Sequence, residues 1–188
     1  MKLKKPSGPA LFMYSVIALT ILIWGFCFAL YYGGKTESNA VLWVGIVSFM
    51  IMYHFWLRII MGNVTKLFKI NPEHWWFQEA PFERKLYKLL KVKKWKGKAL
   101  TYNPESFSLK LHTLEEIVQV TVKSELDHWI NEIISVSAIS FSLIWGEFWI
   151  FFATSLAAMI FDAQFIVIQR FNRPRLLKII KRTKRKDE

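Results

Sequence analysis

Apolar residues are gathered in long uninterrupted runs along the chain, and charged residues are gathered between those runs. The first run, residues 10–32, contains no charged residue, and a second run covers residues 40–61. About 20 apolar helical residues cross a bilayer core, so each run predicts one membrane-spanning helix. The first run is too long for the apolar segment of a signal peptide, and we expect it to remain as an uncleaved anchor.

A third apolar block, residues 129–169, is too long for one span and long enough for two. Its turn signal is Trp145-Gly146-Glu147, which predicts spans at residues 129–145 and 148–169. The former is short and rich in serine, which suits close helix packing in lipid. A re-entrant hairpin is the structural alternative. The sequence therefore predicts an all-α integral membrane protein of about four transmembrane helices, with residues 1–188 forming a single membrane domain.

The charge distribution predicts the orientation of these spans. The chain has 26 lysines and arginines against 14 acidic residues, and 24 of the 26 lie before residue 10, in the loop 62–128 or in the tail 170–188. By the positive-inside rule, both termini and this amphipathic loop are expected in the cytoplasm of a multi-pass cell-membrane protein. A hydrophobic content of 53% excludes a disordered chain and a single soluble domain. The excess charge indicates a membrane surface rather than nucleic acid as the partner.

The loop predicts two amphipathic helices. In residues 71–100, Pro72 and Pro81 stand where helices can begin, and lysines surround an apolar stripe. The stripe consists of Phe82, Leu86, Leu89, Leu90 and Val92. Basic amphipathic helices bounded by tryptophans typically lie in the headgroup plane. A second helix is predicted from Thr113, which forms a capping box with Glu116, and should run on into the membrane.

Three titratable residues share one face of that second helix. Glu125 and His128 are three residues apart, and Glu132 follows four residues later. One interpretation is a solvated helix end. Another is a general base, in which a carboxylate orients the imidazole while the ring takes a hydroxyl proton for attack on an acyl carbonyl. Glu-x-x-His also occurs in di-iron sites, but these need a second such motif. With Cys27 as the single cysteine, we expect no metal and no cofactor.

Three arginines occur within six residues after the last predicted span, in Arg170-Phe171-Asn172-Arg173-Pro174-Arg175. Pro174 predicts a helix break here, with Asn172 capping a new helix. An arginine-bearing helix start is a candidate phosphate site, and an ordinary positive-inside stop signal is the alternative. Asp162 lies within the preceding span, where a carboxylate costs about 2.5–3.5 kcal/mol, and is therefore a candidate for a polar pocket.

Two segments of the chain resemble one family when taken together. The sequence KSELDHWI (123–130), a hydrophobic hairpin, and VIQRFNRPRL (167–176) resemble the glycosyl-diaponeurosporenoate acyltransferase family, as do Tyr87 and residues 92–96 upstream. The resemblance extends from about Pro81 to the C-terminus. It implies a membrane enzyme that esterifies a fatty acyl group onto the sugar hydroxyl of a glycosylated carotenoid. It also implies functional roles for His128, Glu125, Arg170, Asn172, Arg173 and Arg175.

The favoured hypothesis is therefore a membrane acyltransferase. His128 would act as the base, with Glu125 or Glu132 holding its ring. The expected partners are membrane lipid, acyl-CoA as co-substrate, and a glycolipid or glycosyl-carotenoid acceptor, with no nucleic acid. The residues assigned to substrate binding are Arg170, Asn172, Arg173, Arg175, Asp162 and Trp129. The alternative is a non-catalytic four-span module whose basic loop binds anionic lipid or a protein partner.

Overall fold

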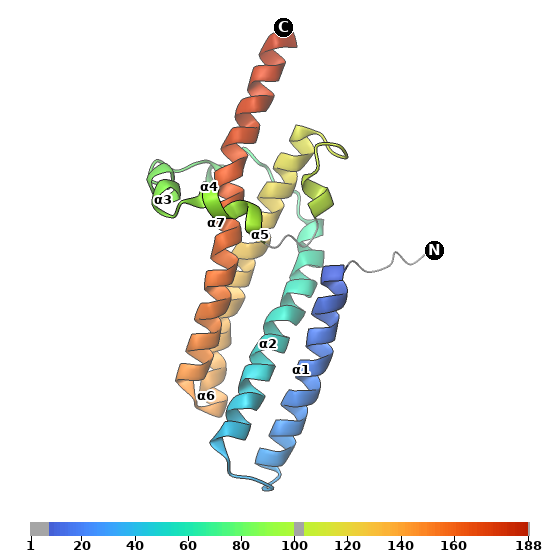
Figure 1. Ribbon diagram of the computed structural model, residues 1–188, viewed down its shortest axis with the longest axis vertical. Coiled ribbons are helices and arrows are strands. Elements are labelled where there is room, and N and C mark those ends of the chain that lie inside the picture. The colour runs from blue at the N-terminus through green and yellow to red at the C-terminus, as the bar shows by residue number, and fades with distance from the viewer. Residues whose placement is uncertain (1–7, 100–103, 188) are drawn as a thin grey trace, which may run out of the picture. The chain divides into compact units, whose positions relative to one another are not determined.

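The computed structural model describes residues 8–99 and 104–187, and the regular elements in these ranges are all helical (Figure 1). The α-helices are α1 (Gly8–Tyr32), α2 (Asn39–Val64), α3 (Glu83–Leu89), α4 (Val92–Trp95), α5 (Leu114–Ala138), α6 (Ser142–Trp145) and α7 (Phe148–Asp187). The short 3-10 helices are η1 (Thr65–Leu67), η2 (Trp75–Phe77), η3 (Lys96–Lys98), η4 (Pro104–Phe107) and η5 (Ile139–Phe141). The all-α prediction is confirmed for the described residues.

Three helical segments are long and apolar enough to cross a membrane: Leu11–Tyr32, Asn39–Leu67 and Phe148–Lys186. They contain the predicted spans 10–32, 40–61 and 148–169 almost entirely, and they indicate a membrane protein. The predicted span 129–145 is not among the three segments. It is divided between the end of α5, η5 and α6, so the fourth span stays a prediction.

The turn between α6 and α7 lies where the sequence predicts it. Gly146 has φ 70° and Glu147 has φ 52°, and α7 begins at the next residue, Phe148. Glycine adopts such left-handed backbone without a steric penalty, which explains its place in this turn.

The predicted helix break at Pro174 is wrong. Helix α7 continues from Phe148 to Asp187 with Pro174 inside it, so Asn172 lies within a helix and caps none. Proline disfavours helical backbone at the residue before it, here Arg173. The side chain of Arg173 is buried and hydrogen-bonded to Thr121 and Glu125 of α5, and these contacts hold the residue in the helix.

The predicted amphipathic helix of the loop is two short helices rather than one long one. Lys91, with φ 50°, separates α3 from α4. The apolar stripe is divided as well, because Phe82 and Leu89 are exposed whereas Val92 is fully buried. A left-handed non-glycine residue interrupts a helix, and nothing in the apolar spacing could indicate it.

The chain divides into two compact units, and α5 and α7 contribute to both. Unit 1 contains Met1–Gly62 and Asn131–Ile160. Its described core consists of Leu42, Ile46, Met50, Ala138 and Phe151, surrounded by aromatic rings. Helices α1 and α2 run alongside each other (Figure 1) and approach closely at Gly45, where a Cβ would lie 2.7 Å from the Phe28 ring.

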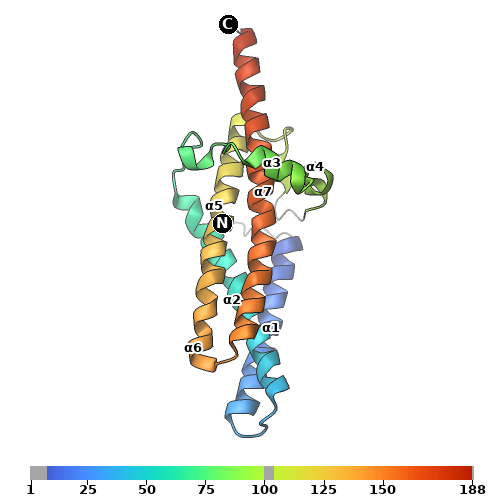
Figure 2. The ribbon, with the colours of Figure 1, turned by 90° about the vertical axis from the view of Figure 1, so that its left-hand side faces the viewer.

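Unit 2 contains Asn63–Ile130 and Phe161–Glu188. Helices α3 and α4 lie across α7 (Figures 1 and 2), where Tyr87 and Val92 pack against Phe171. Thr113 and Glu116 form the predicted capping box, because the Thr113 N–H donates to Glu116 Oε2 and the Glu116 N–H donates to Thr113 Oγ1. The buried face of α5 in this unit consists of Ile117, Val118, Thr121, Val122 and Glu125.

Candidate active site

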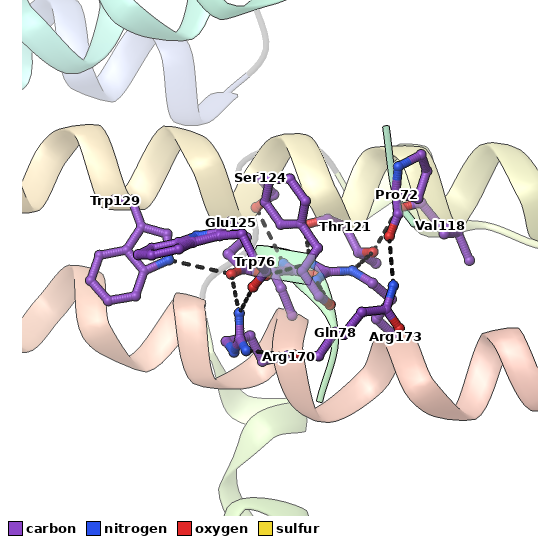
Figure 3. Close-up of polar contacts among 12 residues, drawn as sticks. Pro72, Trp76, Gln78, Val118, Thr121, Ser124, Glu125, Trp129, Arg170 and Arg173 are labelled. Atoms are coloured by element: carbon purple, nitrogen blue, oxygen red, sulfur yellow. Dashed lines mark hydrogen bonds and ion pairs between the residues drawn. The ribbon is translucent and has the colours of Figure 1, made fainter. Parts of the chain in front are cut away.

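Glu125 is a fully buried carboxylate in unit 2, and both of its oxygens are occupied (Figure 3). Arg170 Nη1 donates to Oε1 at 2.7 Å, and Arg173 Nη2 donates to Oε2 at 2.5 Å. The Trp129 indole N–H also donates to Oε1, at 3.3 Å. Burying an unpaired charge costs several kcal/mol, and the two arginines of α7 offset that cost. The sequence places Glu125 beside His128, but its carboxylate contacts the arginines of α7 instead.

The two arginines also form hydrogen bonds with the backbone of residues 76–78. Arg170 donates to the carbonyl oxygens of Trp76 and Gln78, at 2.7 and 2.8 Å. Arg173 donates to the carbonyl oxygen of Phe77 at 2.8 Å. A guanidinium has five N–H donors in a fixed planar arrangement, so it can join several acceptors at once. Two of the three arginines expected to bind phosphate, Arg170 and Arg173, are thus paired with groups of the chain itself.

Glu83 is a second carboxylate at this position, and it was not among the residues predicted from the sequence. Arg170 Nε donates to Glu83 Oε1 at 2.6 Å, and the Tyr87 hydroxyl donates to Oε2 at 2.7 Å. We refer to Glu83, Glu125, Arg170 and Arg173 as the arginine–carboxylate cluster. Burial, then the hydrogen bond to Glu83, raise the pKa of Tyr87 well above its usual value. An acidic residue within a basic stretch is the sequence feature that could have indicated Glu83 as a site residue. Its partner, Arg170, lies 87 residues away in the chain, so the sequence does not show the pairing.

His128 is paired with Asp162. Its Nδ1 lies 2.7 Å from Asp162 Oδ1, and the imidazole stacks on the Phe165 ring at 4.7 Å between centroids with an 8° interplanar angle. The Asp162 side chain is fully buried, whereas that of His128 is 20% exposed. No described residue is hydrogen-bonded to His128 Nε2. The structure therefore supplies a carboxylate that orients the ring, and the carboxylate belongs to α7 rather than to α5.

Glu132 and Trp129 complete the predicted residues of α5. Glu132 lies one helical turn after His128 and is half-buried. The Trp129 ring packs edge-on against Trp76, with ring centroids 5.7 Å apart. Trp129 is therefore fixed by Glu125 and Trp76, and the predicted roles of Glu132 and Trp129 in the reaction stay predictions.

Asn172 and Arg175 lie apart from the arginine–carboxylate cluster, beside the ring of Phe171. Lys96 Nζ donates to Asn172 Oδ1 at 2.6 Å and lies 4.9 Å from the centre of the Phe171 ring. The guanidinium carbon of Arg175 lies 3.5 Å from the centre of the same ring. Burial, followed by the charges of Arg175 and Lys93, lowers the pKa of Lys96. Two residues predicted to bind substrate thus meet a lysine that was not predicted as a site residue.

A comparison with protein families gives one match. The family model described as glycosyl-4,4'-diaponeurosporenoate acyltransferase (CrtO) matches residues 73–182, which is more than half of the chain. No curated protein and no solved structure matches the chain. The matched range contains every residue of the site described above.

Proposed function

Because the chain belongs to the glycosyl-4,4'-diaponeurosporenoate acyltransferase family, we propose that it esterifies a fatty acyl group from acyl-CoA onto a sugar hydroxyl of a glycosylated carotenoid or related glycolipid. The observation that carries the proposal is the pairing of His128 with the fully buried Asp162. We also propose a multi-pass cell-membrane location with both termini cytoplasmic, which the distribution of lysine and arginine supports.

In the proposed reaction His128 is the general base. With Nδ1 protonated and donating to Asp162, Nε2 carries the lone pair that accepts the hydroxyl proton. The hydroxyl oxygen attacks the thioester carbonyl carbon, the C–O bond forms, and the C–S bond breaks. The imidazolium returns the proton to the departing thiolate of coenzyme A. Asp162 stabilises the imidazolium and fixes the ring, as the carboxylate of a Ser-His-Asp triad does.

In this mechanism the arginine–carboxylate cluster positions the base. Glu125 lies one helical turn before His128, and its ion pairs with Arg170 and Arg173 fix α5 against α7. The same contact between helices brings Asp162 of α7 to His128. We therefore assign Glu125 to positioning rather than to contact with the reacting atoms.

The test is acyl transfer by the purified protein in lipid, with labelled acyl-CoA and a pool of glycolipids that includes glycosylated carotenoid. His128→Ala should lower kcat by about 10²–10⁴-fold, the usual contribution of a general base. His112→Ala is the matched control, because His112 is a partly exposed histidine of the same loop and its ion-pair partner is the exposed Glu116. Equal rates for wild-type protein and both variants would contradict the assignment of the base.

A non-catalytic module that binds anionic lipid is the second candidate. Large apolar side chains near the loop lysines are exposed, among them Trp75, Phe82 and Leu89. Exposed apolar side chains beside basic residues favour contact with a lipid surface. This function predicts that neutralising the exposed Lys91 and Lys94 weakens the binding of anionic lipid and that His128→Ala has no effect on any activity of the protein.

A further inference from the structure

Three polar side chains of unit 2 converge where α4 and η3 meet α7. We call Lys96, Asn172 and Arg175 the basic cluster. The Phe171 ring is its centre, with Lys96 at 4.9 Å and Arg175 at 3.5 Å from the ring centroid. Arg175 also donates to the Phe171 carbonyl oxygen, and Asn172 accepts from Lys96. These contacts fix two cationic groups over one buried aromatic ring.

The basic cluster has no compensating carboxylate among the described residues. The ion pairs of unit 2 use Glu79, Glu83, Glu115, Glu116, Glu125 and Asp162, and none of these residues pairs with Lys93, Lys96 or Arg175. Arg170 and Arg173 of the same helix are in contrast both paired with buried carboxylates. Burial and then repulsion by Arg175 and Lys93 lower the pKa of Lys96, and a bound anion would offset the repulsion.

The donors of the basic cluster suit a phosphate group. Lys96 donates one of its three N–H groups to Asn172 Oδ1. The side-chain N–H groups of Asn172 have no acceptor among the described residues. Arg175 is exposed and contributes a planar guanidinium, the group that binds phosphate oxygens in pairs. Lysine adds a point charge and the amide a neutral donor.

We infer that the basic cluster binds the phosphate of a phosphate ester, and that Lys96 and Arg175 are its principal ligands. Two molecules offer this chemistry, namely the nucleotide part of a coenzyme A thioester and the headgroup of an anionic phospholipid. The first source rests on the proposed function, because acyl-CoA is the proposed donor. The second does not depend on it.

The experiment measures binding rather than turnover. Protein in phosphatidylcholine nanodiscs is titrated with coenzyme A, dephospho-coenzyme A and pantetheine, which carries no phosphate. The variant is Lys96→Gln with Arg175→Gln. The matched control is Lys85→Gln with Lys88→Gln, two exposed lysines of α3 that remove the same formal charge. We expect the dissociation constant of coenzyme A to rise at least tenfold in the variant and less than twofold in the control, with pantetheine binding weakly to all three proteins.

A second arm tests the lipid source. In these nanodiscs phosphatidylglycerol replaces part of the phosphatidylcholine. The ³¹P NMR spectrum reports the lipid headgroups that the protein immobilises. If the phospholipid is the ligand, the variant loses this signal and the control keeps it, while coenzyme A binds all the proteins equally. If the variant and the control do not differ with either probe, the inference is wrong.

The two proposals fail separately. If wild-type protein transfers no acyl group and the variant still loses phosphate binding, the proposed function fails and the phosphate site stands. If transfer occurs and the variant keeps the wild-type KM for acyl-CoA and wild-type headgroup binding, the phosphate site fails and the function stands.

Discussion

Glu125 is a buried residue whose charge is balanced by two arginines, at 2.7 and 2.5 Å. Glu125→Gln removes the negative charge and leaves both guanidinium groups short of a partner. Breaking a buried ion pair from one side costs about 3–5 kcal/mol. We therefore expect the midpoint of thermal unfolding in detergent to fall by on the order of 10 °C.

The matched control is Glu115→Gln on the same helix. Glu115 is exposed and lies 3.9 Å from Lys184, a surface contact that contributes about 1 kcal/mol at most. Its unfolding midpoint should stay within about 2 °C of the wild-type value. Equal midpoints for the Glu125 and Glu115 variants would show that Glu125 does not stabilise unit 2.

The raised pKa of Tyr87 predicts that the folded protein loses stability at alkaline pH. Burial raises the pKa of Tyr87, so its hydroxyl stays protonated in the folded chain while the unfolded chain ionises near the usual pKa of 10.0. The folded chain thus holds more protons above that pH, and the stabilising contribution of Tyr87 is complete below about pH 10 and falls as the pH rises. Wild-type unfolding midpoints should therefore drop between about pH 9 and pH 11.

The Tyr87→Phe substitution should remove much of that drop, because it removes the ionisable hydroxyl. Tyr14→Phe, at an exposed position of α1, should keep the wild-type slope. Midpoints measured by scanning fluorimetry at the two pH values compare the three proteins. A pH slope in the Tyr87→Phe variant as steep as that of wild-type protein would be evidence against this contribution.

At the scale of elements, the continuity of α7 is directly measurable. Ala163 and Lys178 are exposed and lie on either side of Pro174. About fifteen residues of continuous helix separate their Cα atoms by about 22 Å. Spin labels at Ala163→Cys and Lys178→Cys, in a Cys27→Ala background, should therefore give one narrow distance distribution in pulsed EPR. A broad or clearly shorter distribution would mean that the helix ends at Pro174.

The elements that local patterns specify were predictable, and those set by distant contacts were not. Long apolar runs, the capping box at Thr113 and the turn at Gly146 each depend on neighbouring residues. The continuation of α7 through Pro174 depends on Arg173 and its partners about 50 residues earlier in the chain. The break at Lys91 has no counterpart in the hydrophobic pattern.

The same division applies to the candidate site. Helical spacing correctly places Glu125 and His128 on α5, one turn apart. The partner of each residue comes from α7, namely Asp162 for His128 and Arg170 with Arg173 for Glu125. Those pairings follow from the register between two helices, which one sequence does not reveal. The cost of a carboxylate in an apolar span singles out Asp162 in the sequence, and the structure pairs it with His128, whereas its predicted role in substrate binding stays a prediction.

At the scale of the molecule, the residues that the structure brings together at the candidate site belong to one unit. Every residue of the arginine–carboxylate cluster, of the basic cluster and of the His128–Asp162 pair lies within unit 2. The family match begins at residue 73 and therefore excludes α1 and α2. The residues proposed for chemistry thus lie in the matched part of the chain, whereas the first two apolar helices lie outside it.

The measurement that tests the central claim most directly is a double-mutant cycle of acyl transfer with His128→Ala and Asp162→Asn. Residues that act as one catalytic unit are strongly non-additive. We expect each single variant to lower kcat by at least about 10²-fold, and the double variant to be about as slow as His128→Ala alone. Losses that multiply in the double variant, or a wild-type rate in either single variant, would contradict the pairing of His128 and Asp162 as the catalytic base.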